Sequence, residues 1–149
     1  MKRTWILIAN ASKACVLERE GRQPRLKQLS RFEDPLGRAK GVDLVSDRAG
    51  YESSPSRGVA GSPYSPPSDP RRQEHERFAL RLARHLDEGV AAQQCDALVL
   101  LASNPFLGEV KAHLGRQSHK ALVSTSSIDL TALSASDLEA RVLELLDAA

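Results

Sequence analysis

The feature that most constrains the fold is the segment at residues 96–102, DALVLLA, in which an uninterrupted apolar run follows Asp96. A run of this length between polar residues is typical of a strand covered on both faces. Such a strand needs packing partners on two sides of its sheet, which favours a layered fold over a two-stranded or open structure. The run is also far shorter than the roughly 18 apolar residues of a membrane-spanning helix, so we expect no membrane insertion.

The N-terminal part of the chain predicts three consecutive strands. They cover residues 4–9, 13–20 and 25–32, and short polar or Gly/Pro-containing connections separate them. The second and third segments alternate apolar and polar residues, which an antiparallel sheet with one polar side tolerates. We therefore expect an antiparallel meander at the start of the chain.

A segment of different composition follows at residues 33–70. It contains most of the prolines together with many Gly and Ser residues. Loops longer than about 12 to 15 residues are uncommon in compact domains and are usually functional or mobile. Two interpretations stay open at this point, a dynamic segment and a working loop, and in both the loop belongs to a single domain over residues 1–149.

The second half of the chain alternates helices and strands. Asp69 and Pro70 form an N-cap and first-turn pair, and Phe78, Leu82 and Leu86 recur every fourth residue of a helix. After the strand at 96–102 we expect a helix capped by Asn104-Pro105, a short strand at 121–124, and a last helix whose capping box is formed by Ser134 and Asp137.

The predicted order is three strands, a long loop, and then helix, strand, helix, strand, helix. Alternating strands and helices require parallel strands with crossover helices, whereas the first three strands supply an antiparallel extension. The fold class is therefore three-layer α/β with a mixed five-stranded sheet. This order is the one of ribonuclease-H-like folds, an analogy that carries no function.

No motif in the chain supplies a complete catalytic centre. There is no GxxxxGK[ST], GxGxxG or GxSxG motif. His75 and Glu76 begin like a zinc-protease HExxH motif, but Ala79 stands where the second histidine belongs. Because the first strand also lacks the acids of a two-metal nuclease, we expect neither an enzyme nor a metal or cofactor. A metal-dependent, nuclease-like hydrolase is the least favoured hypothesis.

The two cysteines and the N-terminus favour a cytoplasmic location. Cys15 and Cys95 lie far apart without a disulfide framework, and each is expected to be a small core residue. The basic N-terminus is followed by an apolar stretch that Asn10 and Ser12 interrupt, so it reads as a first strand and not as a signal peptide.

Charge directs attention to the long loop and the helix that follows it. The net charge of +2 hides a basic start and an acidic end. Guanidinium groups in the loop and on one side of the helix suit phosphate or carboxylate partners. An alternative interpretation is a solvated helix face on which Glu74 and Glu88 pair with Arg77 and Arg84. The charged candidates are Asp47, Arg48, Arg57, Arg71, Arg72, Arg77, Arg81 and Arg84.

Five stretches of the sequence resemble the bacterial host-attachment protein family. They cover nearly the whole chain and read WILIANASKACVLE, DLVSDRAG, DPRRQEHERFALRLARHL, LVLLASNPFLGEVKAHL and SSIDLTALSASDLEARV. The resemblance implies kinship with the middle domain of archaeal and eukaryotic peptide-chain release factors, a ribonuclease-H-like fold without nuclease acids.

The resemblance also implies site residues and excludes one activity. The loop of release factors carries a Gly-Gly-Gln tripeptide, which this chain lacks; Gly58 and Gly61 stand in its loop instead, so peptide release is not expected. The positions that match the family, apart from the core residue Phe78, are Asp47, Arg48, Asp69, Pro70, Glu74, His75 and Glu76.

Two functions of different classes follow. The first is a non-enzymatic, cytoplasmic binding protein whose loop and Arg-bearing helix contact a partner, either ribosomal or transfer RNA or another protein. The second is an adhesion-related protein that acts at the envelope, as the family description suggests. The sequence does not predict an oligomeric state.

Overall fold

A computed structural model of the chain describes residues 2–34 and 70–148. Five strands and four helices form within these residues, and the three-layer α/β fold predicted above is confirmed. The strands are β1 (Arg3–Ala9), β2 (Lys13–Glu20), β3 (Lys27–Glu33), β4 (Ala97–Ala102) and β5 (Leu122–Ser127). The helices are α3 (Pro70–Ala91), α4 (Phe106–His113), α5 (Arg116–Ala121) and α6 (Ala135–Ala148).

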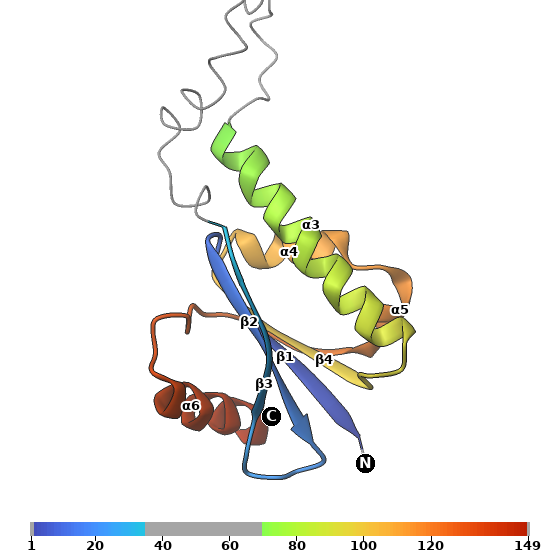
Figure 1. Cartoon of the computed structure of the whole chain (residues 1–149), viewed down its shortest axis with the longest axis vertical. Coiled ribbons are helices and arrows are strands. Elements are labelled where there is room, and N and C mark those ends of the chain that lie inside the picture. Colours follow the sequence, from blue (N-terminus) through green and yellow to red (C-terminus); the bar gives the residue numbers. More distant parts are fainter. Residues whose placement is uncertain (1, 35–69, 149) are drawn as a thin grey trace, which may run out of the picture.

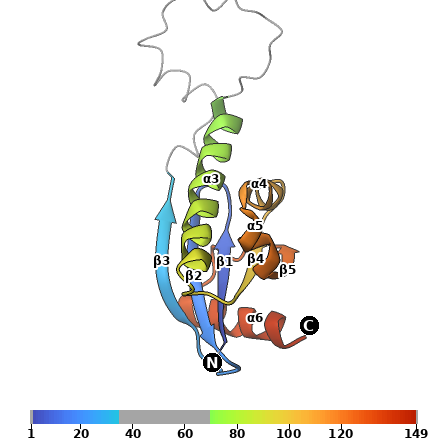
Figure 2. The same cartoon turned by 90° about the vertical axis from the view of Figure 1, so that its right-hand side faces the viewer.

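The five strands form one mixed sheet in the order β3-β2-β1-β4-β5. β1 to β3 are antiparallel neighbours, as the meander predicted, whereas β4 lies parallel to both β1 and β5. Figure 2 shows β3 at one edge of the sheet and β5 at the other. All six residues of β4 are buried, so the apolar run that most constrained the fold is a strand covered on both faces.

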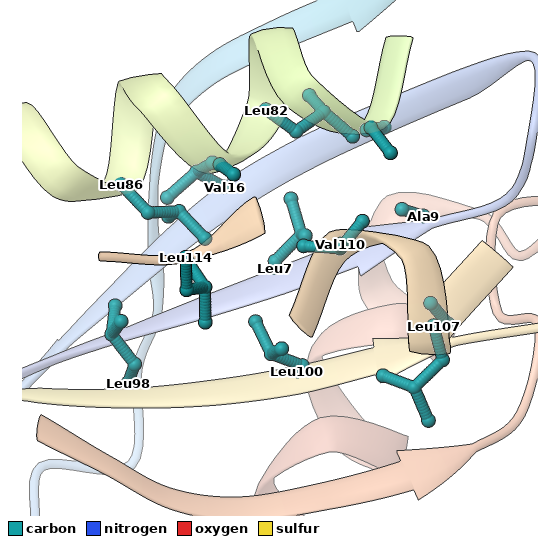
Figure 3. Packing of buried hydrophobic residues seen from close by; sticks show 14 of the residues in the cluster. Leu7, Ala9, Val16, Leu82, Leu86, Leu98, Leu100, Leu107, Val110 and Leu114 are labelled. Atoms are coloured by element: carbon teal, nitrogen blue, oxygen red, sulfur yellow. The ribbon is translucent and has the colours of Figure 1, made fainter. Parts of the chain in front are cut away.

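Helices cover both faces of the sheet (Figure 1). Of the helices in residues 70–148, α3, α4 and α5 lie on one face and form the α3–α5 layer, whereas α6 lies on the other and forms the α6 layer. The apolar positions of α3 pack with Leu7, Val16 and Leu98 of the strands in the larger core cluster (Figure 3). Val142 of α6 packs with Ile6, Ile8, Leu17, Val99 and Leu101 in a smaller cluster. Successive side chains of β1 point to opposite faces of the sheet, so this strand contributes residues to both core clusters.

One glycine brings α3 into close contact with the sheet. Gly89 is buried in the helix against the ring of Trp5, and a Cβ atom at this position would lie 2.2 Å from Cζ3 of the ring. The indole Nε1 in turn donates a hydrogen bond to Glu18 over 3.1 Å. Glycine is therefore needed here for a close approach and not for backbone freedom.

Two predictions for the second half of the chain were wrong. The sequence reading missed α5, a six-residue helix at Arg116–Ala121, because so short a helix shows no clear periodicity. Asn104 does not cap α4, which begins after Pro105 without a side-chain cap. Its amide donates a 2.7 Å hydrogen bond to Ser127 Oγ and thereby joins the ends of β4 and β5.

Other element boundaries shift by a few residues or agree. β3 begins at Lys27 and not at residue 25, and β5 continues to Ser127, three residues beyond its predicted end. At α6, the backbone N–H of Asp137 donates to Ser134 Oγ over 3.2 Å, which confirms Ser134 as the N-cap. Within residues 2–34 and 70–148, no helix is both long and apolar enough to cross a membrane.

Candidate functional site

The candidate residues that the structure describes all lie in α3. They are Arg71, Arg72, Glu74, His75, Arg77, Arg81 and Arg84, with Glu76 beside them. The others lie outside the described residues and stay predictions: Asp47, Arg48, Arg57, Gly58, Gly61 and Asp69. Figure 1 shows that the first turns of α3 extend past the ends of the strands. The long helix thus presents its N-terminal arginines beyond the body of the sheet.

Arg81 is exposed like Arg77 and Arg84, but its side chain also contacts the edge strand β3. Its guanidinium lies 5.3 Å from the ring centre of Phe32 on β3 and 5.8 Å from that of Phe78. Its Nη1 also donates a long 3.5 Å hydrogen bond to the carbonyl of Glu33. Arg81 therefore fastens the edge strand to α3 by cation–π contact, and less of its charge is offered to a partner.

Arg77 forms the ion pair that its spacing from Glu74 predicted. Nη1 of Arg77 lies 2.7 Å from Oε1 of Glu74. The carboxylate is buried, whereas the arginine side chain is 63% exposed. The carboxylate of Glu74 is therefore shielded from solvent, whereas the positive charge of Arg77 stays at the surface.

Residues of α3 and α4 form a second group of titratable side chains, which the sequence reading did not bring together. His113 Nε2 lies 4.0 Å from Glu76 Oε2. Burial raises the pKa of Glu109, while the nearby His75 and Arg72 oppose that shift. Glu109 and His113 stand four residues apart on one helix, a spacing that could have indicated a shared face. Their proximity to α3 depends on helix packing, which spacing does not reveal.

The outer surface of the α3–α5 layer is basic. Its three helices hold eight Arg and Lys residues against five Asp and Glu, and all four histidines of the chain. Seven of the eight basic residues are exposed, whereas only Glu76 and Glu88 among the acids are. Asp87, for example, accepts hydrogen bonds from Gly115 N and Ser118 Oγ of α5. The fold therefore turns a nearly balanced sequence into a positive surface.

The α6 layer has the opposite charge. α6 holds four acids, Asp137, Glu139, Glu144 and Asp147, against Arg141 alone. Asp147 pairs with Arg19 of β2 over 3.0 Å, and Glu139 accepts the backbone N–H of Leu26 over 2.9 Å. These acids thus hold α6 to the antiparallel part of the sheet as well as making its surface negative.

A polar cluster lies at the carboxyl ends of β1 and β5. Asn10 donates to Asp129 Oδ2 over 3.2 Å and to Thr131 Oγ1 over 3.0 Å, and its own Oδ1 accepts the backbone N–H of Lys13. Burial alone would raise the pKa of Asp129, but hydrogen bonds from Thr131 and Asn10 and the charge of Lys13 hold that pKa below its usual value. These bonds link two connections of the fold.

Neither cysteine has the surroundings of an activated nucleophile. Cys95 is buried beside β4, and burial raises the pKa of its thiol to about 11. Burial also raises the pKa of Cys15, which Arg31 only partly opposes. A nucleophilic cysteine needs the opposite shift. In the described part of the chain, no three His, Cys, Asp or Glu side chains are grouped closely enough to hold a metal ion.

A comparison with known protein families identifies the family of this chain. The profile of a family described as "Protein required for attachment to host cells" matches residues 5–142. The chain belongs to this family. The resemblance inferred from the five sequence stretches is therefore confirmed, and no curated protein shows a significant match.

Solved structures share the fold of this host-attachment family member at low sequence identity. An archaeal translation termination factor, aRF1, superposes with a TM-score of 0.53 and 10% identity over 98% of this chain and 39% of the factor. A second structure, described as an archaeal protein, gives 0.50 and 13% over 95% of this chain and 36% of its own length. The chain thus spans less than half of either protein, and the likeness establishes a release-factor-like fold alone.

Proposed function

We propose that this host-attachment family member is a non-enzymatic binding protein that contacts RNA through the α3–α5 layer. The observation that carries the proposal is the charge of that layer, where exposed basic side chains outnumber exposed acids by seven to two. Phosphate contacts from Arg and Lys supply most of the sequence-independent affinity of proteins for nucleic acids. Ribosomal and transfer RNA are the partner class that this surface suits.

The position of the charges supports an extended contact. Arg72 lies on the N-terminal part of α3, Arg84 just over three turns further along, and Arg116 at the start of α5. All three side chains are exposed. A surface that follows a long helix suits a phosphate backbone better than a small anion, which a compact pocket would bind.

The release-factor-like fold adds a second, weaker support. The solved structure of similar fold is named as a translation termination factor, a protein that works in translation. Because fold does not determine function, this likeness only makes RNA a reasonable first partner to test. The cytoplasmic location and the loop residues Asp47, Arg48 and Arg57 belong to the same proposal.

The test is RNA binding as a function of salt concentration. Fluorescence anisotropy with labelled transfer RNA should show an affinity that falls steeply as salt rises. A triple variant, Arg72→Glu, Arg84→Glu and Arg116→Glu, should weaken binding by at least about tenfold and make the logarithmic salt slope shallower by about 2, because three phosphate contacts are lost.

The matched control reverses three cations outside the layer: Arg22→Glu, Arg25→Glu and Lys27→Glu, in and beside the β2–β3 connection. It changes the net charge of the protein by the same amount, so an effect of total charge would appear in both variants. Equal weakening by the two triple variants, or a salt-independent affinity, would contradict a localised RNA surface.

The family description supports a second candidate function, an adhesion-related role at the cell envelope. Here the same basic layer would bind an anionic component of the envelope. Cell fractionation separates the two functions, since a direct envelope role requires recovery of the chain in the envelope fraction. Recovery in the soluble fraction alone, together with RNA binding, would make an effect on attachment indirect.

A further inference from the structure

A cavity of about 200 Å³ opens between the sheet and the start of α6. Gln28 and Arg31 of β3 line it on one side, and Thr131 and Leu133, from the connection between β5 and α6, line it on another. β3 and β5 are opposite edges of the sheet, so this connection crosses the sheet before α6 begins. The cavity therefore belongs to the α6 side of the sheet and is separate from the proposed RNA surface.

The cavity has an apolar floor. Ile8 of β1 is fully buried there, and Leu138 of α6 packs against the same core cluster. Leu133 lines the cavity as well and is 40% exposed, one of two large apolar side chains so exposed in the described part of the chain. Small-molecule sites typically combine such apolar walls with a few polar groups. A ligand with an apolar body would cover Leu133 and fill the space above Ile8.

The size of the cavity limits what it can hold. An apolar cavity of about 150 Å³ is sufficient for one benzene molecule. A volume of about 200 Å³ therefore admits one ring-sized body with a small polar group. A nucleotide or a long acyl chain would not fit inside it.

Two cations stand at the cavity. Lys13 of β2 and Arg31 of β3 both line it, and neither forms an ion pair within residues 2–34 and 70–148. Glu33 is the acid that lines the same cavity, so two cations against one acid leave a net charge of +1. Asp129 lies near Lys13, but its carboxylate already accepts hydrogen bonds from Thr131. The lining therefore suits a ligand with one negative charge.

We propose that this cavity binds a compact organic carboxylate, which is a ring-sized apolar body bearing one carboxylate group. The body packs on Ile8 and Leu138, and the carboxylate meets Arg31 and Lys13. A guanidinium group matches a carboxylate through two parallel hydrogen bonds. A phosphate monoester fits less well, because its charge of nearly −2 exceeds that of the lining and is repelled by Glu33.

The test is an NMR titration of the full chain with three probes: benzoate, phenylacetate and cyclohexanecarboxylate. About ten non-hydrogen atoms are enough for a dissociation constant of about 1 mM. We expect at least one probe to reach it and to shift the backbone amide signals of Cys15, Gln28 and Thr131, which all line the cavity. The neutral amide of the tightest probe should bind about tenfold more weakly, because the charged hydrogen bonds are lost. Phenyl phosphate should also bind more weakly than the carboxylate.

A thiol locates the bound probe independently. Cys15 lines the cavity and is partly exposed, whereas Cys95 is buried elsewhere in the core. A bound carboxylate should slow the modification of Cys15 by N-ethylmaleimide, which mass spectrometry follows at each cysteine. Since the charge of Arg31 also acts on this thiol, rates are compared with and without the probe within each variant.

Arg31→Gln should weaken binding of the carboxylate about tenfold. The matched control is Lys27→Gln, which removes the same charge from the same strand outside the cavity and should leave the affinity unchanged. Circular dichroism spectra confirm that both variants are folded.

Three results would overturn the proposal. The first is the absence of shifts at the cavity with all three probes at about 20 mM, twenty times the expected dissociation constant. The second is an amide or phenyl phosphate that binds as tightly as the carboxylate. The third is equal weakening by Arg31→Gln and Lys27→Gln. None of them bears on RNA binding, which is measured separately on the other side of the sheet.

Discussion

The two helical layers differ both in how much they bury and in the charge they present. Among the described residues, the α3–α5 layer shares a cluster of eighteen buried residues with the sheet, whereas α6 shares one of seven. The larger layer is also the basic one, and α6 is acidic. The layer that packs in the larger core cluster therefore also carries the proposed binding surface. A variant in this layer must be tested for folding before a loss of binding is interpreted.

The largest effect is expected when a leucine side chain is removed from each layer. Leu86 of α3 is fully buried, whereas Leu145 of α6 is only partly buried at the margin of its cluster. We expect Leu86→Ala to lower the free energy of unfolding by about 3 kcal/mol and Leu145→Ala by about 1 kcal/mol, because the first leaves a cavity and the second exposes less new surface. Urea denaturation measures both, and equal losses would contradict the difference between the layers.

The second test adds a methyl group within the larger layer. Gly89→Ala places a Cβ against the Trp5 ring, and overpacking of this kind costs about 1–3 kcal/mol of unfolding free energy. Gly108 of α4 is the matched control, since nothing outside the neighbouring helix backbone lies within 4 Å of its added Cβ. Gly108→Ala should stabilise the protein by up to about 1 kcal/mol through helix propensity. If both substitutions raised the free energy of unfolding, the Trp5 ring would have to move away from position 89 with little loss of stability.

The third test uses pH, which acts on His85 in the α3–α5 layer. His85 stacks on Trp5 with ring centres 5.8 Å apart, meets the edge of Phe32 at 5.0 Å, and lies 3.2 Å from Ser30 Oγ. Burial lowers the pKa of His85, and nearby Glu88 partly offsets this; Arg81 adds a further positive charge to the group around Phe32.

The sign of the effect follows from proton linkage. Below an unfolded-state pKa of about 6.5, the unfolded chain binds a proton at His85 more readily than the folded chain does. Stability is therefore retained above about pH 6.5 and is lost as the pH falls through the lower folded-state pKa. Urea denaturation at several pH values should show a smaller loss for His85→Asn than for the wild type. The matched control is His119→Asn, which removes a histidine from the exposed surface of α5 and leaves His85 in place.

The smallest expected effect concerns the attachment of α6. Asp147 is 56% exposed and pairs with the largely buried Arg19, which also donates to the carbonyls of Gln23 and Arg22. Asp147→Asn should cost no more than about 1 kcal/mol of unfolding free energy, since an exposed partner contributes little and the backbone bonds remain. Glu144→Gln, in a pair with both side chains more exposed, should cost less, and thermal melts compare the two.

Most of the fold could be predicted because its elements have strong local signals. The apolar run of β4, the alternation in β2 and the four-residue spacing in α3 each depend on a few neighbouring residues. α5 could not be predicted, because a helix of six residues leaves too few positions for a period to appear. The prediction that Asn104 caps α4 was wrong because the Asn104 side chain donates a hydrogen bond to Ser127, a residue of β5.

The candidate site was predicted less well than the fold. Spacing alone correctly paired Arg77 with Glu74, since both lie on one helix. The same spacing grouped Arg81 with Arg77 and Arg84, but it gave no sign that this side chain would also contact Phe32 and Glu33 of β3. It also missed the approach of His113 to Glu76, which depends on the packing of α4 against α3.

The sequence by itself determined the family from its matching stretches. It also determined the element order, apart from the short helix α5, and the division into an antiparallel and a parallel part, because these depend on local patterns of apolar residues. Only the tertiary structure decided which charges are displayed. Packing buries Glu74 and engages Asp87 with α5, while most of the arginines and lysines around them stay exposed. A nearly neutral chain thereby acquires one basic and one acidic face, because burial depends on contacts between elements that are distant in the sequence.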